Sequence, residues 1–112
     1  MERYGMIRHI SIFAVNDRKT DVPVLLDMLL AVQRDCPLAC GGMVAPSAQV
    51  TPPLLDVDEG PVFGDVIQVL DFPDQDAAAG YPSCEAHLEL LKKSPPMIRQ
   101  VTAIDFYLPG VR

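Results

Sequence analysis

Two segments of the chain, residues 7–15 and 62–72, are rich in β-branched residues and would be apolar on both faces if they were extended. A strand with one face in water alternates cleanly between apolar and polar residues, because successive side chains point to opposite faces. Neither segment alternates in this way. We therefore expect a sheet that is covered on both faces, in a chain of 112 residues that has room for one core.

A first helix is expected after the first strand segment. Residues 22–32 carry apolar side chains at helical spacing, and the helix should continue to about Asp35. Thr20 or Asp21 is the expected cap, and Pro23 then falls in the first turn, where a missing N–H is harmless. The helix is apolar beyond a single stripe, which indicates cover on more than one side.

A second helix is expected in two pieces. It should start at Asp74, break at the Gly-Tyr-Pro of residues 80–82, and restart with Ser83 as its cap. The Ser-Pro-Pro sequence that follows should end it by Lys93 or Ser94, because proline cannot continue a helix.

Two further strands complete the pattern. A short one is expected within residues 39–50, where Gly41 and Gly42 indicate a bulge or a close backbone approach. A longer one is expected at residues 97–108. Residues 51–61 are rich in proline and acidic side chains and are expected to form a long loop.

The element order is strand, helix, strand, strand, helix, strand, which is the ferredoxin-like βαββαβ pattern of the α+β class. It predicts a four-stranded antiparallel sheet with both helices on one face, in a single domain that spans residues 1–112. The other face of the sheet is also apolar and needs cover. A second copy of the same sheet supplies that cover most economically, so we expect a homodimeric α+β barrel.

Net charge and cysteine content narrow the function classes. The formal net charge of −6 argues against nucleic acid and anionic membranes as partners, since both attract clustered Lys and Arg. No apolar run is long enough to cross a bilayer, and we expect no signal peptide. Three cysteines without a framework spacing indicate a cytoplasmic location. We expect no metal and no cofactor, since neither a ligand spacing nor a phosphate-binding glycine loop is present.

The chain has two histidines, His9 and His87. His87 shares a helix face with Leu90 that should point at the sheet, where a neutral imidazole could act as a general base. Tyr81, six residues earlier, could position a substrate carbonyl or stabilise an enolate. Both residues have plainer alternatives. His87 could be a core histidine that donates to a backbone carbonyl, and Tyr81 could simply close the helix break.

Four more residues are candidates for binding a substrate. His9, Ser11 and Phe13 lie on one face of the first strand and could line the same cavity, or His9 could tie that strand or a dimer interface by a hydrogen bond. Gln68 is a polar residue among apolar ones in the third strand. It could face the cavity too; otherwise its amide must be paired across the sheet.

The sequence resembles the stress-responsive dimeric α+β barrel (Dabb) family at four places. "MIRHISIF" is similar to the family's opening strand, "GDVIQVLDF" to its third strand and "IDFYLP" to its closing strand. The spacing from Tyr81 to His87 matches the family's Tyr-x-x-His-Pro-x-His element. The likeness spans nearly the whole chain and implies the same dimeric barrel.

The family includes a plant polyketide cyclase, and the resemblance implies roles for individual residues. His87 would be the general base, Tyr81 the assisting tyrosine and His9 a residue that lines the cavity. Asp105 also falls on a family position, where we expect a structural hydrogen bond.

The sequence departs from the family at two places within the site. Cys84-Glu85 replaces the family's His-Pro pair, and Val66 stands near the position of a third-strand histidine.

The leading prediction is a small cofactor-free enzyme of polyketide-like or aromatic metabolism, which abstracts a proton α to a carbonyl and promotes aldol-type cyclisation or isomerisation. The alternative is a non-catalytic dimeric protein of the stress response or of small-molecule binding, and a third is a cofactor-free monooxygenase. A cavity on the order of several hundred Å³ would favour a small-molecule site, and space filled by side chains would favour a non-catalytic protein.

Overall fold

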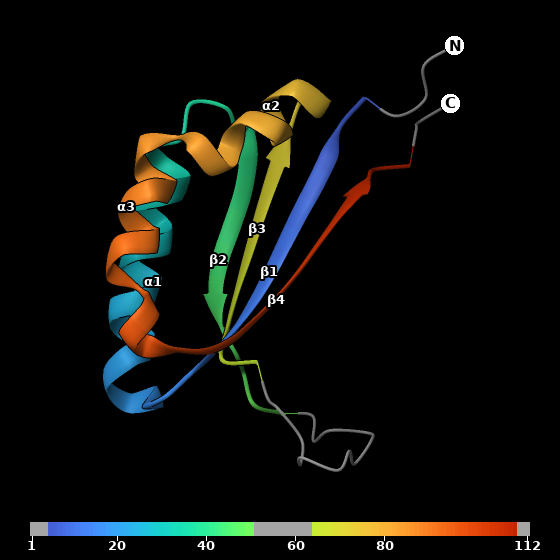
Figure 1. Cartoon of the computed structure of the whole chain (residues 1–112). Coiled ribbons are helices and arrows are strands. Elements are labelled where there is room, and N and C mark those ends of the chain that lie inside the picture. Colours follow the sequence, from blue (N-terminus) through green and yellow to red (C-terminus); the bar gives the residue numbers. More distant parts are fainter. Residues whose placement is uncertain (1–4, 51–63, 110–112) are drawn as a thin grey trace.

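The computed structural model describes residues 5–50 and 64–109 and shows one sheet with helices on one face (Figure 1). The elements in chain order are β1 (Ile7–Val15), α1 (Arg18–Asp35), β2 (Gly41–Pro46), β3 (Val66–Phe72), α2 (Gln75–Gly80), the 3-10 turn η1 (Tyr81–Ser83), α3 (Glu85–Lys93), the 3-10 turn η2 (Pro95–Met97) and β4 (Ile98–Tyr107). The strands pair antiparallel in the order β2-β3-β1-β4. The predicted ferredoxin-like α+β fold is confirmed.

Helix α1 begins earlier than the sequence analysis predicted. Its cap is Asp17, whose carboxylate accepts hydrogen bonds from the backbone N–H of Lys19 at 3.1 Å and of Thr20 at 3.4 Å. The predicted cap at Thr20 or Asp21 is therefore wrong, because Asp17 satisfies the free amides of the first turn directly after β1. Pro23 consequently lies in the second turn rather than in the first.

The interrupted second helix was predicted correctly, with one error at its restart. Asp74 caps α2 by accepting from the Ala77 N–H at 2.9 Å. The cap of α3 is Cys84 rather than Ser83, because the Cys84 N–H donates to the Tyr81 carbonyl at 2.9 Å and so closes the 3-10 turn around Ser83. The Cys84 side chain makes no capping bond.

The close backbone approach predicted for the glycine pair is confirmed at Gly42. Its φ of +154° lies in a region that side chains rarely adopt, and a Cβ there would collide with the backbone oxygen of Val69 on β3. Gly41 has room for a Cβ, since the nearest heavy atom would lie 3.8 Å away in Asp71.

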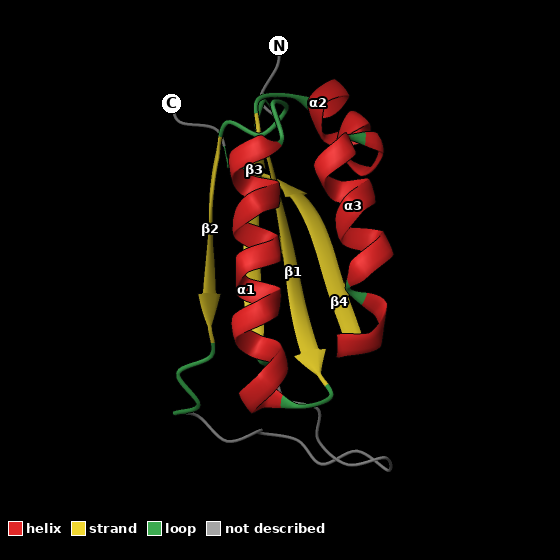
Figure 2. Cartoon of the chain, turned by 90° about the vertical axis from the view of Figure 1, so that its left-hand side faces the viewer, coloured by secondary structure: helices red, strands yellow, loops and turns green. Residues whose placement is uncertain are grey.

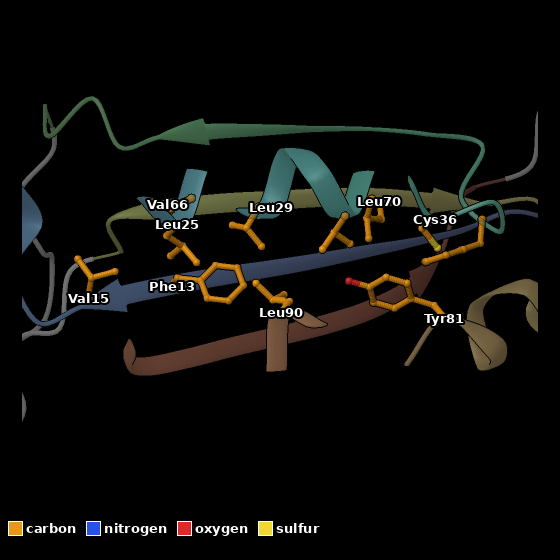
Figure 3. Packing of buried hydrophobic residues seen from close by; sticks show 11 residues of the cluster. Phe13, Val15, Leu25, Leu29, Cys36, Val66, Leu70, Tyr81 and Leu90 are labelled. Atoms are coloured by element: carbon orange, nitrogen blue, oxygen red, sulfur yellow. The ribbon is translucent and has the colours of Figure 1, made fainter. Parts of the chain in front are cut away.

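The core fills the space between the sheet and the two long helices, which lie side by side across it (Figure 2). Figure 3 shows the buried side chains of this layer, with Leu25 and Leu29 from α1 and Leu90 from α3 packed against the sheet. The sheet contributes Phe13, Val66, Leu70 and Phe72.

The opposite face of the sheet carries no helix (Figure 1) and is largely apolar. Large apolar side chains are exposed there from three strands: Ile12, Met43, Ile104 and Phe106. One ion pair crosses this face, in which Arg8 donates to both carboxylate oxygens of Asp71 at 2.8 and 3.0 Å.

Two of the features expected from the sequence cannot be compared with the described residues. The expected loop at residues 51–61 and the first two residues of the expected third strand lie outside the described residues. Within the described ranges, none of the helices combines the length and the apolar character that a membrane crossing requires.

Candidate functional site

A cavity of about 300 Å³ lies between the sheet and the segment that runs from η1 through α3. Strands β1, β3 and β4 form its floor. All six residues that the sequence analysis selected line it: His9, Ser11, Phe13, Gln68, Tyr81 and His87. His9 and His87, which are 78 residues apart in sequence, thus line the same cavity.

The β-sheet register explains how the strand residues converge. His9, Ser11 and Phe13 alternate along β1 and so point to the same face. Ser11 pairs directly with Gln68 on β3, and His9 pairs directly with Asp105 on β4. Side chains at paired positions lie on one face, which brings both neighbours to the cavity.

His87 is held by the turn that precedes its helix. The Nδ1 of His87 lies 3.0 Å from the carbonyl oxygen of Pro82. A carbonyl can only accept, so Nδ1 carries the proton and donates it, and in the neutral ring Nε2 has a free lone pair. The geometry leaves a nitrogen that can accept a proton in a ring whose orientation is fixed.

Tyr81 packs between the two histidines. Its ring centroid lies 4.7 Å from that of His87, 5.7 Å from that of His9 and 5.4 Å from that of Phe72, all in tilted arrangements. The residue is buried, and Figure 3 shows its oxygen pointing toward the middle of the core cluster.

The phenol of Tyr81 stays protonated in this environment. Burial raises the pKa of Tyr81 well above its ordinary value, and the nearby Cys84 thiol raises it further. The nearby Gln68 amide opposes this rise in the pKa. Tyr81 is therefore a hydrogen-bond donor rather than a base.

Gln68 is the most buried polar residue of the site, at 1% exposed. Although its amide lies close enough to the Tyr81 phenol to influence its ionisation, its Nε2 has no well-aligned acceptor within the described part of the chain. An unpaired buried N–H group is unfavourable, so an acceptor atom of a ligand or of an ordered water beside it would be stabilising.

His9 is hydrogen-bonded at both ring nitrogens. Its Nδ1 lies 2.6 Å from a carboxylate oxygen of Asp105, and its Nε2 lies 2.8 Å from the Ser11 hydroxyl. The sequence analysis assigned Asp105 a structural hydrogen bond but did not place it in the site. The predicted topology could have revealed this contact. The first and last strands pair antiparallel, so residues near the start of β1 lie opposite residues near the end of β4.

The two departures from the family pattern change the surroundings of His87 and the sheet. Cys84 lies beside the site, and burial raises the pKa of its thiol. Val66 is buried on the sheet, so this position contributes packing. Across the described ranges, no three His, Cys, Asp or Glu side chains are grouped as metal ligands would be.

Comparisons with known proteins show the fold. No family model matches the chain, and no curated protein matches it. A dimeric ferredoxin-like protein of unknown function from Thermobifida fusca is 21% identical, with 96% of this chain and 95% of that chain covered at a TM-score of 0.75.

Two further solved structures are similar. A Dabb family protein with a ferredoxin-like fold from Mesorhizobium loti is 19% identical, with 95% of this chain and 99% of that one covered at a TM-score of 0.71. The hydroxynitrile lyase from Passiflora edulis is 12% identical, with 97% and 98% covered at a TM-score of 0.72. These matches define the class of the chain as a ferredoxin-like α+β protein.

Proposed function

We propose that this protein is a small cofactor-free enzyme that abstracts a proton α to a carbonyl of a polyketide-like or aromatic substrate and so promotes aldol-type cyclisation or isomerisation. One observation carries the proposal. A fixed imidazole with a free Nε2 and a neutral buried phenol lie 4.7 Å apart, ring to ring, on the wall of one cavity. The cavity volume of about 300 Å³ suits a small aromatic molecule.

The roles follow from which groups can accept and which can donate. His87 Nε2 takes the proton from the α-carbon, and the Tyr81 hydroxyl donates to the carbonyl oxygen on which negative charge develops. Gln68 on the cavity floor offers a further donor, since its Nε2 is unpaired among the described residues. Phe13, His9 and Ser11 line the remainder and shape the substrate.

The proposed assembly is a homodimer of this chain. The exposed apolar side chains on the helix-free face of the sheet would be buried if two sheets packed face to face, as in a dimeric barrel. The similar protein from Thermobifida fusca is described as dimeric. The Dabb resemblance of the sequence points to the same assembly.

The test is deuterium exchange into an aryl methyl ketone, whose α-protons exchange slowly in neutral buffer. The protein should accelerate exchange, and His87→Ala should lower that acceleration by about 100-fold or more while its far-ultraviolet circular dichroism stays unchanged. Exchange at the same rate with His87→Ala would refute His87 as the base.

The bond from His87 to Pro82 also favours a second candidate, a non-catalytic small-molecule-binding protein, because it is the contact expected of a core histidine. The two candidates differ in one result. A binding protein would shift the His87 NMR signals on addition of a phenolic ligand, without exchange catalysis by the wild type. The third candidate, a cofactor-free monooxygenase, would consume oxygen with a hydroquinone.

A further inference from the structure

Three polar side chains on the sheet form a continuous hydrogen-bonded chain beside the cavity. Asp105 accepts from His9 Nδ1 at 2.6 Å, and His9 Nε2 lies 2.8 Å from the Ser11 Oγ. All three residues line the cavity. We propose that they form a second reactive centre, in which Ser11 is a nucleophile that takes the acyl group of a small ester.

When the His9 ring is neutral, its two partners determine where the protons lie. The Asp105 carboxylate can only accept, so His9 Nδ1 carries a proton, and Nε2 of the neutral ring accepts the proton of the Ser11 hydroxyl. This is the order that activates a serine: carboxylate, imidazole, hydroxyl. Asp105 is 67% exposed at its side chain, so solvent screens its charge and its main effect is to fix the orientation and tautomer of His9.

A donor for the developing oxyanion lies across the sheet. Ser11 pairs directly with Gln68 on β3, and both side chains line the cavity. Gln68 is buried, and its Nε2 is unpaired among the described residues. A carbonyl oxygen held beside Ser11 would supply the acceptor that this N–H group lacks.

The reaction balances without any added reagent except water. Ser11 Oγ bonds to the ester carbonyl carbon while its proton passes to His9 Nε2. The bond from that carbon to the alcohol oxygen then breaks, and the leaving alcohol takes the proton from Nε2. Water then adds to the acyl carbon and gives a proton to His9 Nε2. The bond from that carbon to Ser11 Oγ breaks, Oγ takes the proton from Nε2, and a carboxylic acid leaves.

The cavity restricts the substrate class. A volume of about 300 Å³ and a lining that includes Phe13, Phe72 and Leu90 suit a short acyl or benzoyl ester without charge. A phosphorylated or carboxylate-bearing ester would find no lysine or arginine among the lining residues.

An alkyl fluorophosphonate tests the nucleophile directly. Its phosphorus bonds to an activated serine with loss of fluoride, and peptide mass spectrometry locates the added mass. We expect labelling on Ser11 that is lost in Ser11→Ala and slowed by about 100-fold or more in His9→Gln and in Asp105→Asn. The matched control is Ser94→Ala. Ser94 is also buried and lines the cavity, but the bonds of the two histidines go to Asp105, Ser11 and Pro82.

Each outcome decides the proposal. Labelling on Ser11 that depends on His9 supports it, as does a burst of nitrophenol from p-nitrophenyl acetate that Ser11→Ala abolishes. Absence of label on Ser11, labelling equally on Ser94, or labelling unaffected by His9→Gln overturns it. This centre does not use His87. His87→Ala should therefore remove ketone exchange but leave Ser11 labelling. The two proposals can thus fail independently, and the two assays show which one has failed.

Discussion

The ring centroid of Tyr81 lies 4.7 Å from that of His87, and the two side chains share the wall of one cavity. Tyr81 is fixed by the 3-10 turn that interrupts the second helix, and His87 is fixed by its bond to a carbonyl of the same turn. The pair is therefore positioned by one short segment, η1, rather than by long-range contacts alone.

Tyr81→Phe should separate the contribution of the Tyr81 hydroxyl to catalysis from the contribution of its ring to stability. The substitution keeps the ring contacts to Phe72 and His87, so the free energy of unfolding should change by less than about 1.5 kcal/mol. The rate of ketone exchange should fall by about 100-fold, because the donor to the developing enolate is lost. Exchange kinetics and urea unfolding measure the two effects. An unchanged rate would remove Tyr81 from the mechanism. Leu29→Val controls for loss of packing alone, because Leu29 is buried but does not line this cavity.

Ile104→Glu should prevent self-association. Ile104 is 59% exposed on the helix-free face of the sheet, so the charge is harmless in a monomer but would be buried without a partner between two sheets. Sedimentation equilibrium should report a dimer for the wild type and a monomer for the variant. Val24→Glu, at an exposed position on α1, is the control and should leave the dimer intact. A wild-type protein that sediments as a monomer would contradict the barrel.

Gly42→Ala should be strongly destabilising and Gly41→Ala nearly neutral. A Cβ at Gly42 collides with backbone of β3 and also requires a φ that alanine rarely adopts, whereas a Cβ at Gly41 makes only ordinary contacts. We expect a loss of about 2 kcal/mol or more at Gly42 and less than about 1 kcal/mol at Gly41. Chemical denaturation of the two variants gives the comparison. A loss of less than about 1 kcal/mol at Gly42 would show that the pairing of β2 with β3 tolerates the extra atom.

The ion pair of Arg8 and Asp71 should make stability depend on pH in the acid range. The Arg8 guanidinium donates to both oxygens of Asp71 and holds the pKa of that carboxyl below its ordinary value. Because the folded pKa is lower than the unfolded one, the pair stabilises the fold fully above the unfolded pKa of about 4. The contribution is lost as the pH falls from there through the lowered folded value.

Arg8→Gln should therefore reduce stability at neutral pH and flatten its decline in acid. Urea unfolding between about pH 7 and pH 2.5 measures both effects. Arg34→Gln is the control, since Arg34 and Asp35 are an exposed pair that is adjacent in sequence and stays close in the unfolded chain. Identical acid profiles for wild type and Arg8→Gln would show that the pair does not contribute.

The local sequence pattern was enough to predict most of the helices and strands. The span of β1, the end of α1 and the break in the second helix follow from alternation, helical spacing and proline, which act over a few residues. The cap of α1 was misplaced by three or four residues and that of α3 by one, because several adjacent side chains could cap and the choice depends on where the preceding strand or turn ends.

The sequence indicated which residues would line a common cavity, but not how those residues would be hydrogen-bonded. That His9, Gln68, Tyr81 and His87 share a cavity follows from strand faces and from the family resemblance. The bonds that His9 makes to Asp105 and Ser11 depend on strand register and on side-chain rotamers. Those are properties of the assembled sheet, and no short stretch of sequence encodes them.

The pairing of β1 with β4 has a consequence for how the protein becomes active. His9 and Asp105 are 96 residues apart, and the cavity floor is complete only when the last strand has joined the first. A chain that is still being synthesised can form α1 and pack it against β1, yet it has no site. Function should therefore appear late and all at once during folding, as expected for a topology whose decisive contacts are the most distant in sequence.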